Sequence, residues 1–585
     1  MKSKWKVMEP LERLRKQLGQ IYHQADAQAA YRAIREKLQR FQVPRQSAQR
    51  YAFSQKDMVL ITYADQFQMT GQPALKGLAW FAEKYLSGAF NTIHILPFFP
   101  YSSDDGFSVI DYYRVARDFG DWENIRALSE RFRLMIDGVF NHISQESVWF
   151  QKFKEGLAPY SQYFITVPPG ADLSAVMRPR TSPLLTAVRT ANGEQQVWTT
   201  FSADQIDLNF ANPRVLLEII DVLLFYVRQG AGIIRIDAVP FLWKEIGTDC
   251  IHRPQTHALV KLLRALLDAA APGVALITES NVPFAENISY LGDLAALDGQ
   301  GDEAQLVYQF SLGPLVLHAL SSGNGKKLSD WVETLPAPYD YFNFIASHDG
   351  IGLLPAQGIL DEADIQALID RAEAHGGLLS YKTDARGKRQ VYELNISLYD
   401  FLNDPAQPDN TLSVWRYLTS QIIMLELAGV PGVYVHSLFG SGNCMDCVEE
   451  SGRARSINRE KFRVEALEQE LAGDSRTARI LSRYLALAAL RAAHPAFSPA
   501  AAQRVLRLDE RVLALLRGEG GSGERILCLS NLGDTSRSVK VDWLKDVGFA
   551  HTGGALRDLI AEENIPLKEH QAEITLAPYQ SRWLI

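Results

Sequence analysis

The chain has 585 residues, of which 47% are hydrophobic and 22% are charged, a composition typical of a globular protein with a large core. Its net charge of −8 provides no basic field for gathering nucleic acid or anionic lipid, and no apolar run approaches membrane-spanning length. We therefore expect a soluble protein that acts on small molecules, with no nucleic-acid or membrane partner and an oligomeric state that the sequence does not reveal.

The four cysteines, Cys250, Cys444, Cys447 and Cys528, are sparse and irregularly spaced. This distribution is unlike a disulfide framework, and the N-terminus lacks the apolar core of a signal peptide, so we expect a cytoplasmic protein. Cys444 and Cys447 form a C-x-x-C pair, but no second pair or histidine cluster completes a zinc site. We interpret the pair as structural, with a redox role as the alternative, and expect neither a metal nor an organic cofactor.

Residues 1–50 are predicted to form a helical extension packed on a larger body. Leu11, Leu14, Leu18 and Tyr22 recur there at helical spacing among charged and Gln residues.

From residue 58 onward, short β-rich apolar runs alternate with longer amphipathic stretches, which is typical of repeated βα units. Eight such runs predict a (β/α)8 barrel, an α/β fold, over residues 51–495. The predicted strands are Val59–Tyr63, Thr92–Leu96, Arg133–Asp137, Gly232–Asp237, Val274–Glu279, Leu306–Phe310, Tyr341–Ser347 and Gly432–His436, with helices such as Val215–Arg228 and His257–Ala270 between them.

Two gaps between predicted strands are too long for a single helix. They are residues 144–205, rich in Pro, Ser and Thr, and residues 353–412, rich in Gly, Asp and Ala. Both follow the carboxyl end of a predicted strand, where barrel enzymes build their active sites, so we interpret them as inserted lids. After residue 495, apolar and polar residues alternate around turns, which predicts a small antiparallel β-domain over residues 496–585.

Charged side chains stand at the ends of several predicted strands. Arg235 and Asp237 end the fourth strand, Glu279 ends the fifth and Asp349 follows the seventh, and a closed barrel brings such ends together. Cleaving a glycosidic bond with retention needs a carboxylate nucleophile and a second carboxyl group about 5–5.5 Å away. Neighbouring strands lie about 4.8 Å apart, so Asp237 and Glu279 can meet this requirement.

Taken singly, each candidate has a structural explanation. A lone Asp at a strand end often caps a helix or pairs with a cation, and we expect Asp137 to be structural. His142 and His348 fit buried, hydrogen-bonded histidines, Arg455 fits a solvated surface, and Phe107 fits the core. Their joint placement after several strands favours an active site.

Further segments accompany these strand ends: Ile61–Gln66, Ser103–Phe107, Trp198–Ser202, Gln205–Leu208, Lys244–Thr248, His348–Gly352 and Ser456–Arg459. Together they resemble the signature regions of the α-amylase superfamily of glycoside hydrolases, and more narrowly of its sucrose phosphorylase branch. The resemblance covers nearly the whole chain after the N-terminal extension, and its strength lies in the combination of segments.

The resemblance implies a role for each candidate residue. Asp237 is expected to be the nucleophile and Glu279 the general acid/base. Asp349 is expected to bind the glucose 2- and 3-hydroxyls and to stabilise the transition state, and Arg235 to keep Asp237 ionised. The other implied glucose-binding residues are His142 and His348 as hydroxyl partners, Asp104 and Arg455 as the pair that closes the far end of the pocket, and Phe107 as an apolar platform.

The acceptor decides the reaction class: water gives hydrolysis, whereas phosphate gives α-glucose 1-phosphate. Arg178 and Arg180 in the first insertion resemble the branch's acceptor loop, and Tyr392 in the second resembles its phosphate-side loop. Because guanidinium and hydroxyl donors suit a phosphate dianion, we assign Arg180 and Tyr392 to recognition of phosphate or the leaving group, with inorganic phosphate as co-substrate.

Segments Thr278–Pro283, Glu286–Ile288 and Val307–Phe310 resemble most closely the glucosylglycerate phosphorylases. This resemblance implies 2-O-α-glucosylglycerate as donor, and a cation such as Arg178 or Arg180 for the glycerate carboxylate.

The sequence departs from the branch on its acceptor side, at Pro240, Phe284, Gly442 and Cys444. The alternatives are therefore a phosphorylase of sucrose or sucrose 6′-phosphate, a retaining α-glucosidase that uses water, and a non-catalytic sugar-binding homologue. The presence of all three carboxylates argues against the last.

Overall fold

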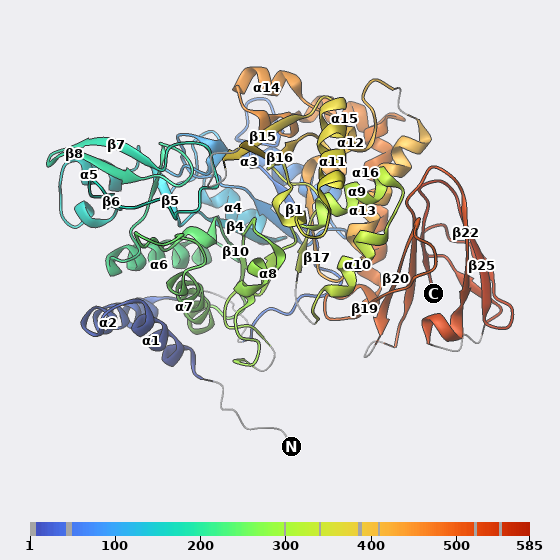
Figure 1. Cartoon of the computed structure of the whole chain (residues 1–585), viewed down its shortest axis with the longest axis horizontal. Coiled ribbons are helices and arrows are strands. Elements are labelled where there is room, and N and C mark those ends of the chain that lie inside the picture. The colour runs from blue at the N-terminus through green and yellow to red at the C-terminus, as the bar shows by residue number, and fades with distance from the viewer. Residues whose placement is uncertain are drawn as a thin grey trace.

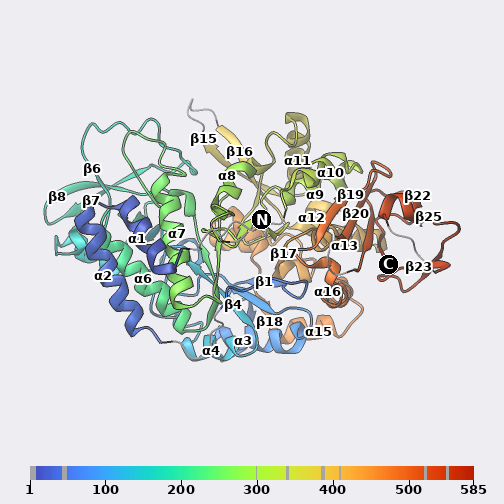
Figure 2. The ribbon, with the colours of Figure 1, turned by 90° about the horizontal axis from the view of Figure 1, so that it is seen from below.

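The computed structural model describes residues 8–42, 49–297, 300–337, 341–383, 389–407, 410–519, 523–548 and 553–585. Two N-terminal helices lie at one end of the molecule, a strand barrel with its helices occupies the middle, and a β-domain lies at the other end (Figures 1 and 2).

Eight parallel strands close the barrel in the order β1-β17-β13-β12-β11-β10-β4-β3. Their bounds are β1 Val59–Thr62, β3 Thr92–Ile95, β4 Arg133–Gly138, β10 Ala231–Ile236, β11 Ala275–Thr278, β12 Leu306–Tyr308, β13 Tyr341–Asn343 and β17 Val430–Tyr434. Each overlaps one of the eight strands predicted from the sequence, so the predicted barrel is confirmed. In the sequence these strands are short apolar runs, because their side chains fill the barrel on the inside and pack against the covering helices on the outside.

The helices are α1 Pro10–Ile21, α2 Gln24–Arg40, α3 Ala74–Phe81, α4 Trp122–Ser129, α5 Val148–Lys154, α6 Pro213–Arg228, α7 Pro254–Ala270, α8 Phe284–Ile288, α9 Leu312–Ser322, α10 Lys326–Thr334, α11 Glu362–Ala374, α12 Leu398–Leu402, α13 Thr411–Glu426, α14 Met445–Ser451, α15 Val464–Leu471 and α16 Arg476–Ala493. Helix α6 shows how the local sequence sets their ends. The Asn212 side chain accepts a first-turn N–H, and Pro213 occupies the first position, where a missing N–H costs nothing.

The N-terminal helices pack on the outer helices of the barrel, α1 on α7 and α2 on α6. Asp268 of α7 receives three guanidinium groups, from Arg13 of α1 at 2.6 Å, from Arg50 at 2.5 Å and from Arg264 of α7 at 3.1 Å. The Tyr22 hydroxyl donates to the carbonyl oxygen of Phe210 over 2.8 Å. Buried polar contacts therefore fix this pair of helices to the barrel.

Two long segments between barrel strands carry small sheets of their own. After β4, strands β5 His142–Ser144 and β9 Gln205–Asp207 pair with each other, and β6 Thr166–Val167, β8 Gly193–Trp198 and β7 Leu185–Thr190 form a second sheet. After β13, strands β14 Ile351–Gly352, β16 Arg389–Asn395 and β15 Leu378–Thr383 form a third, in that order. Both segments leave from the carboxyl ends of barrel strands, the end at which barrel enzymes place their active sites.

A C-terminal antiparallel β-domain follows α16, which confirms this part of the predicted fold. Its main sheet has the order β19 Ala502–Val505, β20 Val512–Glu519, β21 Ile526–Asn531, β26 Ser581–Leu584, and the strand pairs β22 Arg537–Asp542 with β25 Gln571–Leu576 and β23 Ala555–Arg557 with β24 Asn564–Pro566 lie beside it. The remaining strands, β2 Phe67–Gln68 and β18 Phe462–Arg463, pair with each other on the barrel side.

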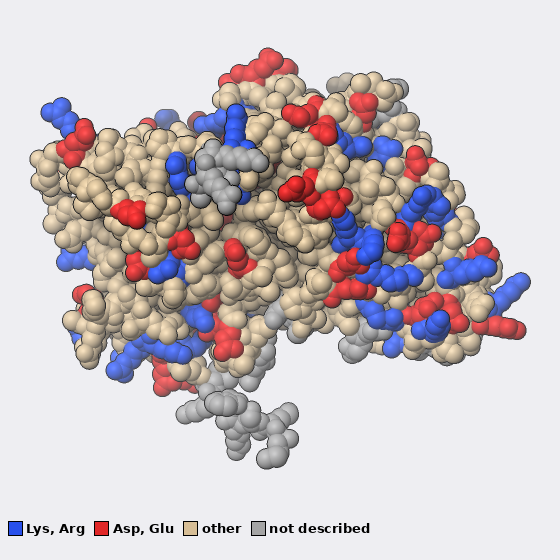
Figure 3. Space-filling model, in the orientation of Figure 1, with Lys and Arg blue, Asp and Glu red and all other residues tan. Residues whose placement is uncertain are grey.

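Acidic and basic side chains are interspersed over the face of the molecule that Figure 3 shows. Within the described residues, no helix has the length and apolarity that crossing a bilayer requires.

Candidate active site

The carboxyl ends of the barrel strands open into a cavity of about 420 Å³, a size typical of sites for small molecules. All the site residues proposed from the sequence line it, although they come from segments spread over most of the chain. These residues are Asp104, Phe107, His142, Arg178, Arg180, Arg235, Asp237, Glu279, His348, Asp349, Tyr392 and Arg455.

Asp237 and Glu279 follow neighbouring strands at the same level. β10 and β11 pair in register with Ile236 opposite Thr278, so the next residue on each strand is one of the two acids. The backbone N–H of Ala238 donates to Oε2 of Glu279 over 3.0 Å. Ala238 adopts the left-handed region at φ 50°, a backbone conformation that β-carbon sterics disfavour and that often marks a functional site.

Arg235 connects both acids to the barrel interior. It lies opposite Asp137 in the pairing of β10 with β4, and the two buried side chains form an ion pair. Its Nη1 lies 3.0 Å from Oδ1 of Asp237, and its Nη2 lies 4.0 Å from Oε2 of Glu279. Asp137 does not line the cavity and also contacts Nε2 of His94 at 2.7 Å, an arrangement that suits a structural role.

The two acids differ in their protonation chemistry. Burial raises the pKa of Glu279, the charge of Arg235 opposes this rise and the charge of Asp237 adds to it, so that the pKa reaches about 7. Burial also raises the pKa of Asp237, and Arg235 and His142 oppose this rise only in part. Because Asp237 contacts the guanidinium directly and Glu279 is an ångström farther away, Glu279 is the acid that keeps a proton near neutral pH.

Asp349 lies among cationic side chains at the other side of the cavity. Arg455 forms an ion pair with its Oδ1, Nη2 of Arg459 lies 4.0 Å from the same oxygen, and Nε2 of His348 lies 3.6 Å from Oδ2. Burial alone would raise the pKa of Asp349, but these charges, Arg455 above all, lower it far below its usual value. Asp349 is therefore ionised at any physiological pH.

Arg455 pairs with Asp349 and Glu393, while Asp104 accepts a hydrogen bond of 3.2 Å from Nε2 of Gln205. Burial would raise the pKa of Asp104, but Arg180 and Arg455 lower it. Asp104 and Arg455 thus face the same cavity and feel each other's charge, although their direct partners are other residues.

Aromatic rings form one wall of the cavity. The Phe107 ring stacks on the His348 imidazole, with centroids 5.1 Å apart, and the Arg235 guanidinium lies 5.7 Å from the Phe107 ring. Burial lowers the pKa of His348 to about 3, which makes it a neutral hydrogen-bonding group. His142 Nε2 lies 2.8 Å from the carbonyl oxygen of Phe107, so it is held by the segment that carries this ring.

The two insertions meet at the mouth of the cavity. Nη1 of Arg180, from the first insertion, donates to the Tyr392 hydroxyl, from the second, over 2.5 Å. Arg178 donates to the carbonyl oxygen of Ser182 within its own loop. Lys382 on β15 also lines the cavity, so the two insertions bring three cationic side chains to it: Arg178, Arg180 and Lys382.

The positions at which the sequence departs from the phosphorylase branch have different surroundings. Pro240 lines the cavity two residues beyond Ala238, whereas Phe284 does not and instead contacts the rings of Trp331 and Tyr341. Gly442 packs against the Asp400 carboxylate, where an added Cβ would lie 3.1 Å from Oδ2.

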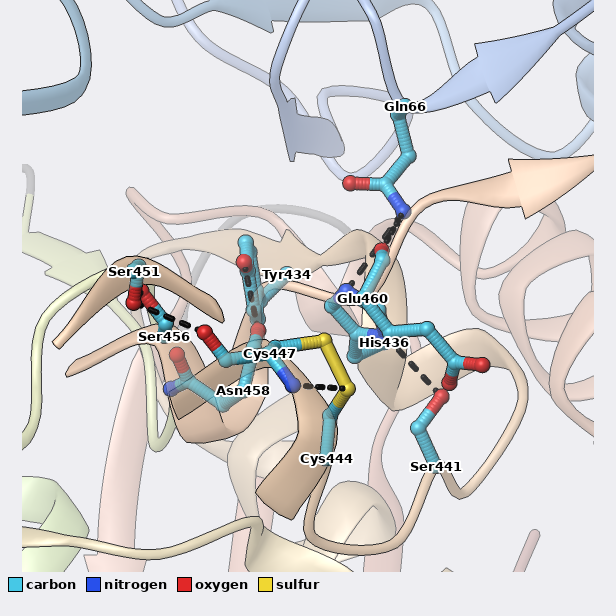
Figure 4. The surroundings of a disulfide bond; sticks show 10 residues. All are labelled: Gln66, Tyr434, His436, Ser441, Cys444, Cys447, Ser451, Ser456, Asn458 and Glu460. Atoms are coloured by element: carbon cyan, nitrogen blue, oxygen red, sulfur yellow. Dashed lines mark hydrogen bonds between the residues drawn. A yellow bond between two sulfur atoms is a disulfide. The ribbon is translucent and has the colours of Figure 1, made fainter. Parts of the chain in front are cut away.

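Cys444 and Cys447 form a disulfide at the start of α14 (Figure 4). Sγ of Cys444 accepts the N–H of Cys447, and the N–H of Cys444 donates to the carbonyl oxygen of Ile457 over 2.8 Å. The disulfide therefore braces the segment that carries Arg455 and Arg459.

The residues that received no role in the sequence interpretation include Gln205 and Arg459, which line the cavity, and Glu393, which lies behind Arg455. Gln205 and Arg459 lie inside segments that resemble the superfamily and Glu393 is next to Tyr392, so the sequence indicated their location but not their partners. Gln205 contacts both Asp104 and His142, at 3.2 Å each. Among the described residues, no group of three or more His, Cys, Asp or Glu side chains is placed to hold a metal ion.

Comparison with known proteins agrees with this architecture. The family described as "Alpha amylase, catalytic domain" matches residues 81–346, and "Maltogenic Amylase, C-terminal domain" matches residues 503–583. The chain therefore belongs to the α-amylase family, in the branch that contains the sucrose and glucosylglycerate phosphorylases, which confirms the resemblance seen in the sequence.

Two curated relatives that are similar to this chain over most of its length are named glucosylglycerate phosphorylase. The protein from Spirochaeta thermophila is 47% identical over 90% of this chain and 90% of its own length. The protein from Allomeiothermus silvanus is 49% identical over 83% of this chain and 87% of its own length. The crystal structure of a sucrose 6F-phosphate phosphorylase from Thermoanaerobacter thermosaccharolyticum matches with a TM-score of 0.70 and 27% identity, covering 82% of this chain and 94% of that one.

Proposed function

We propose that the protein is a retaining phosphorylase that transfers the glucosyl unit of 2-O-α-glucosylglycerate to inorganic phosphate. The observation that carries this proposal is the placement of Asp237 and Glu279 on one cavity, with Arg235 between them, in a chain nearly half identical to named glucosylglycerate phosphorylases. No step of the mechanism needs a metal or an organic cofactor.

In the first step, ionised Asp237 attacks the anomeric carbon of the donor. The bond from this carbon to the glycerate oxygen breaks, and Glu279 gives its proton to that oxygen, so glycerate leaves as the free hydroxy acid anion. The pKa of Glu279 near 7 suits this role, because about half of the enzyme holds the proton at neutral pH. The products are a glucosyl ester of Asp237 and a Glu279 carboxylate.

In the second step, an oxygen of hydrogen phosphate attacks the same carbon from the face that glycerate left. The ester bond to Asp237 breaks, and the Glu279 carboxylate takes the phosphate proton, which restores both acids to their starting states. Two inversions at one carbon give net retention, so the product is α-glucose 1-phosphate.

The remaining cavity residues bind the glucosyl unit and stabilise developing charge. Asp349 is ionised and accepts hydrogen bonds from sugar hydroxyls, which strengthen as the ring becomes an oxocarbenium ion. His142 and neutral His348, with Asp104 and Arg455, supply the other hydroxyl partners. The Phe107 ring, stacked on His348, forms the apolar platform beneath the sugar.

The acceptor side of the cavity must bind an anion in both steps, because the leaving glycerate and the incoming phosphate are both negatively charged. Arg180 and Tyr392 provide a guanidinium and a hydroxyl donor at the mouth of the cavity, with Arg178 and Lys382 close by. This cationic site favours phosphate over water as the acceptor, since water gains nothing from the positive charge.

A product assay tests the proposal. The protein is incubated with glucosylglycerate, with sucrose and with sucrose 6′-phosphate, each with and without phosphate, and glucose 1-phosphate and free glucose are measured. We expect glucose 1-phosphate from glucosylglycerate only when phosphate is present. If sucrose or sucrose 6′-phosphate gives more glucose 1-phosphate than glucosylglycerate does, the proposed donor is wrong. Free glucose formed independently of phosphate would make the enzyme a hydrolase.

A further inference from the structure

Glu393 is a buried carboxylate outside the cavity whose two oxygens are both bound by one arginine. Its Oε1 accepts from Nε of Arg455 over 2.9 Å, and its Oε2 accepts from Nη2 over 2.6 Å. The third donor nitrogen of Arg455, Nη1, pairs with Asp349. A single guanidinium thus joins Glu393 to the acid that we assign to binding the glucosyl unit, in a paired geometry that only arginine provides.

The backbone around Glu393 ties the same two regions together. Glu393 lies on β16 opposite Gly352 of β14, the strand that begins two residues after Asp349. Its side chain packs on Gly350, the residue next to Asp349: a Cβ at that position would lie 2.4 Å from Cγ of Glu393. The Gly in the His348–Gly352 segment therefore makes the room that Glu393 occupies.

Tyr392, the neighbour of Glu393 on β16, lines the acceptor side of the cavity and accepts from Arg180. Successive strand residues point to opposite faces, so β16 presents Tyr392 to the acceptor and Glu393 to the guanidinium that holds Asp349. The position of one strand thus controls both ends of the site.

We propose that Glu393 is a positioning residue, which holds Arg455 in place against Asp349 and thereby couples the acceptor loop to the glucosyl subsite. Only the acceptor part of this coupling rests on the proposed function, whereas the effect of Glu393 on Arg455 and Asp349 does not. With Glu393 in place, Arg455 shares its charge between two carboxylates, and Asp349 keeps enough negative charge to serve the transition state. Without that second carboxylate, Arg455 is free to neutralise Asp349, and β16 loses its anchor beneath Tyr392.

The test uses Glu393→Gln, Arg455→Lys and the double variant, with α-glucosyl fluoride as donor and fluoride release as the readout. Glu393→Gln is expected to lower kcat/KM for fluoride release by about 10-fold or more, within the range of coupling between contacting charged residues. If Glu393 acts through Arg455, the loss in the double variant is smaller than the product of the two single losses. Multiplicative losses, or an unchanged rate in Glu393→Gln, would overturn the proposal.

Glu303→Gln is the matched control, because Glu303 is equally buried and paired, to His257 at 3.0 Å, but does not line the cavity. It is expected to release fluoride at the wild-type rate. A loss equal to that in Glu393→Gln would mean that the loss of any buried carboxylate has this effect, which would overturn the positioning role of Glu393. If Glu393→Gln does not fold, Glu393→Asp takes its place, because aspartate keeps the charge but is too short to make both bonds to Arg455. It is expected to show the same loss of fluoride release, and a wild-type rate in this variant would overturn the proposal.

The partition between acceptors tests the loop half. With glucosylglycerate and phosphate, Glu393→Gln is expected to release a larger fraction of free glucose than wild type, because Tyr392 is held less firmly. An unchanged fraction would confine Glu393 to the glucosyl subsite and overturn the coupling. Fluoride release needs neither glycerate nor phosphate, so a wild-type protein that releases fluoride but forms no glucose 1-phosphate contradicts the proposed function and not the role of Glu393.

Discussion

The backbone N–H of Ala238 donates to Oε2 of Glu279 over 3.0 Å. Ala238 directly follows Asp237, so the residue next to one acid of the pair orients the other. The neighbouring strands β10 and β11 thus position both acids together, and the distance between them depends on strand pairing rather than on loop conformation.

Removing the proton donor tests the role of Glu279 directly. Glu279→Gln keeps the shape and the hydrogen bond from Ala238 but cannot transfer a proton, so kcat on glucosylglycerate is expected to fall by about 10²–10⁴-fold. The melting temperature, measured alongside, is expected to stay close to wild type. Unchanged turnover in the folded variant would rule out Glu279 as the acid.

The pH dependence of the first step follows from the raised pKa of Glu279, about 7. The step needs the protonated acid, so kcat/KM for glucosylglycerate is expected to fall about tenfold per pH unit well above pH 7. With α-glucosyl fluoride this decline is expected to vanish, because fluoride leaves without a proton. The same alkaline decline for both donors would place its cause in another group.

Arg180 is expected to act on the acceptor. Arg180→Ala removes a charged donor at the cavity mouth, and a lost bond to a charged group costs about 1.5–3 kcal/mol, so the KM for phosphate is expected to rise by one to two orders of magnitude. Fluoride release from α-glucosyl fluoride is expected to change little. Arg189→Ala, at an exposed position on β7 of the same insertion, is the matched control. Equal KM values for phosphate in wild type and Arg180→Ala would remove Arg180 from the acceptor site.

Glu426 gives the protein a pH-dependent stability that is separate from catalysis. It is the last residue of α13 and lies buried against the C-terminal sheet, where Trp583 Nε1 donates to it over 2.8 Å, and burial raises its pKa from 4.5 to about 8. The folded state therefore binds a proton that the unfolded state releases between these values. The stability from this group is complete below about pH 4.5 and is lost as the pH rises towards 8, by up to about 1.4 kcal/mol per unit.

Glu426→Gln is expected to remove this pH dependence, as measured by chemical unfolding between pH 5 and 8. Glu373→Gln, at an exposed position on α11, is the control and is expected to keep the wild-type slope. Parallel pH profiles for wild type and Glu426→Gln would show that Glu426 does not titrate in this range.

The sequence predicted the parts of the fold and site that depend on local pattern. Each barrel strand is a short apolar run, Asp237 and Glu279 come directly after such runs, and Asp349 follows another after a short loop, so strand number and the convergence of the acids follow from periodicity and topology. Arg235 is a similar case, because its place two residues before Asp237 puts both on one face of the strand.

Contacts between loops that are far apart in the sequence could not be predicted from local pattern. Arg455 lies 62 residues from Glu393 and 106 from Asp349, and their ion pairs depend on how the second insertion and the segment after β17 fold back over the barrel. No local spacing encodes that path, so the sequence placed Arg455 with Asp104 but could not name its direct partners. The left-handed backbone at Ala238 is similar, since alanine carries no signal for it.

The proposed mechanism requires Asp237 to form a covalent bond to glucose while Glu279 faces it across the cavity. Glu279→Gln is incubated with α-glucosyl fluoride without phosphate, so that the first step needs no acid and the second lacks its base, and the protein is then analysed by mass spectrometry. We expect the mass of one added glucosyl residue, located at Asp237 in the peptide that contains it. No adduct, or an adduct on another residue, would contradict it.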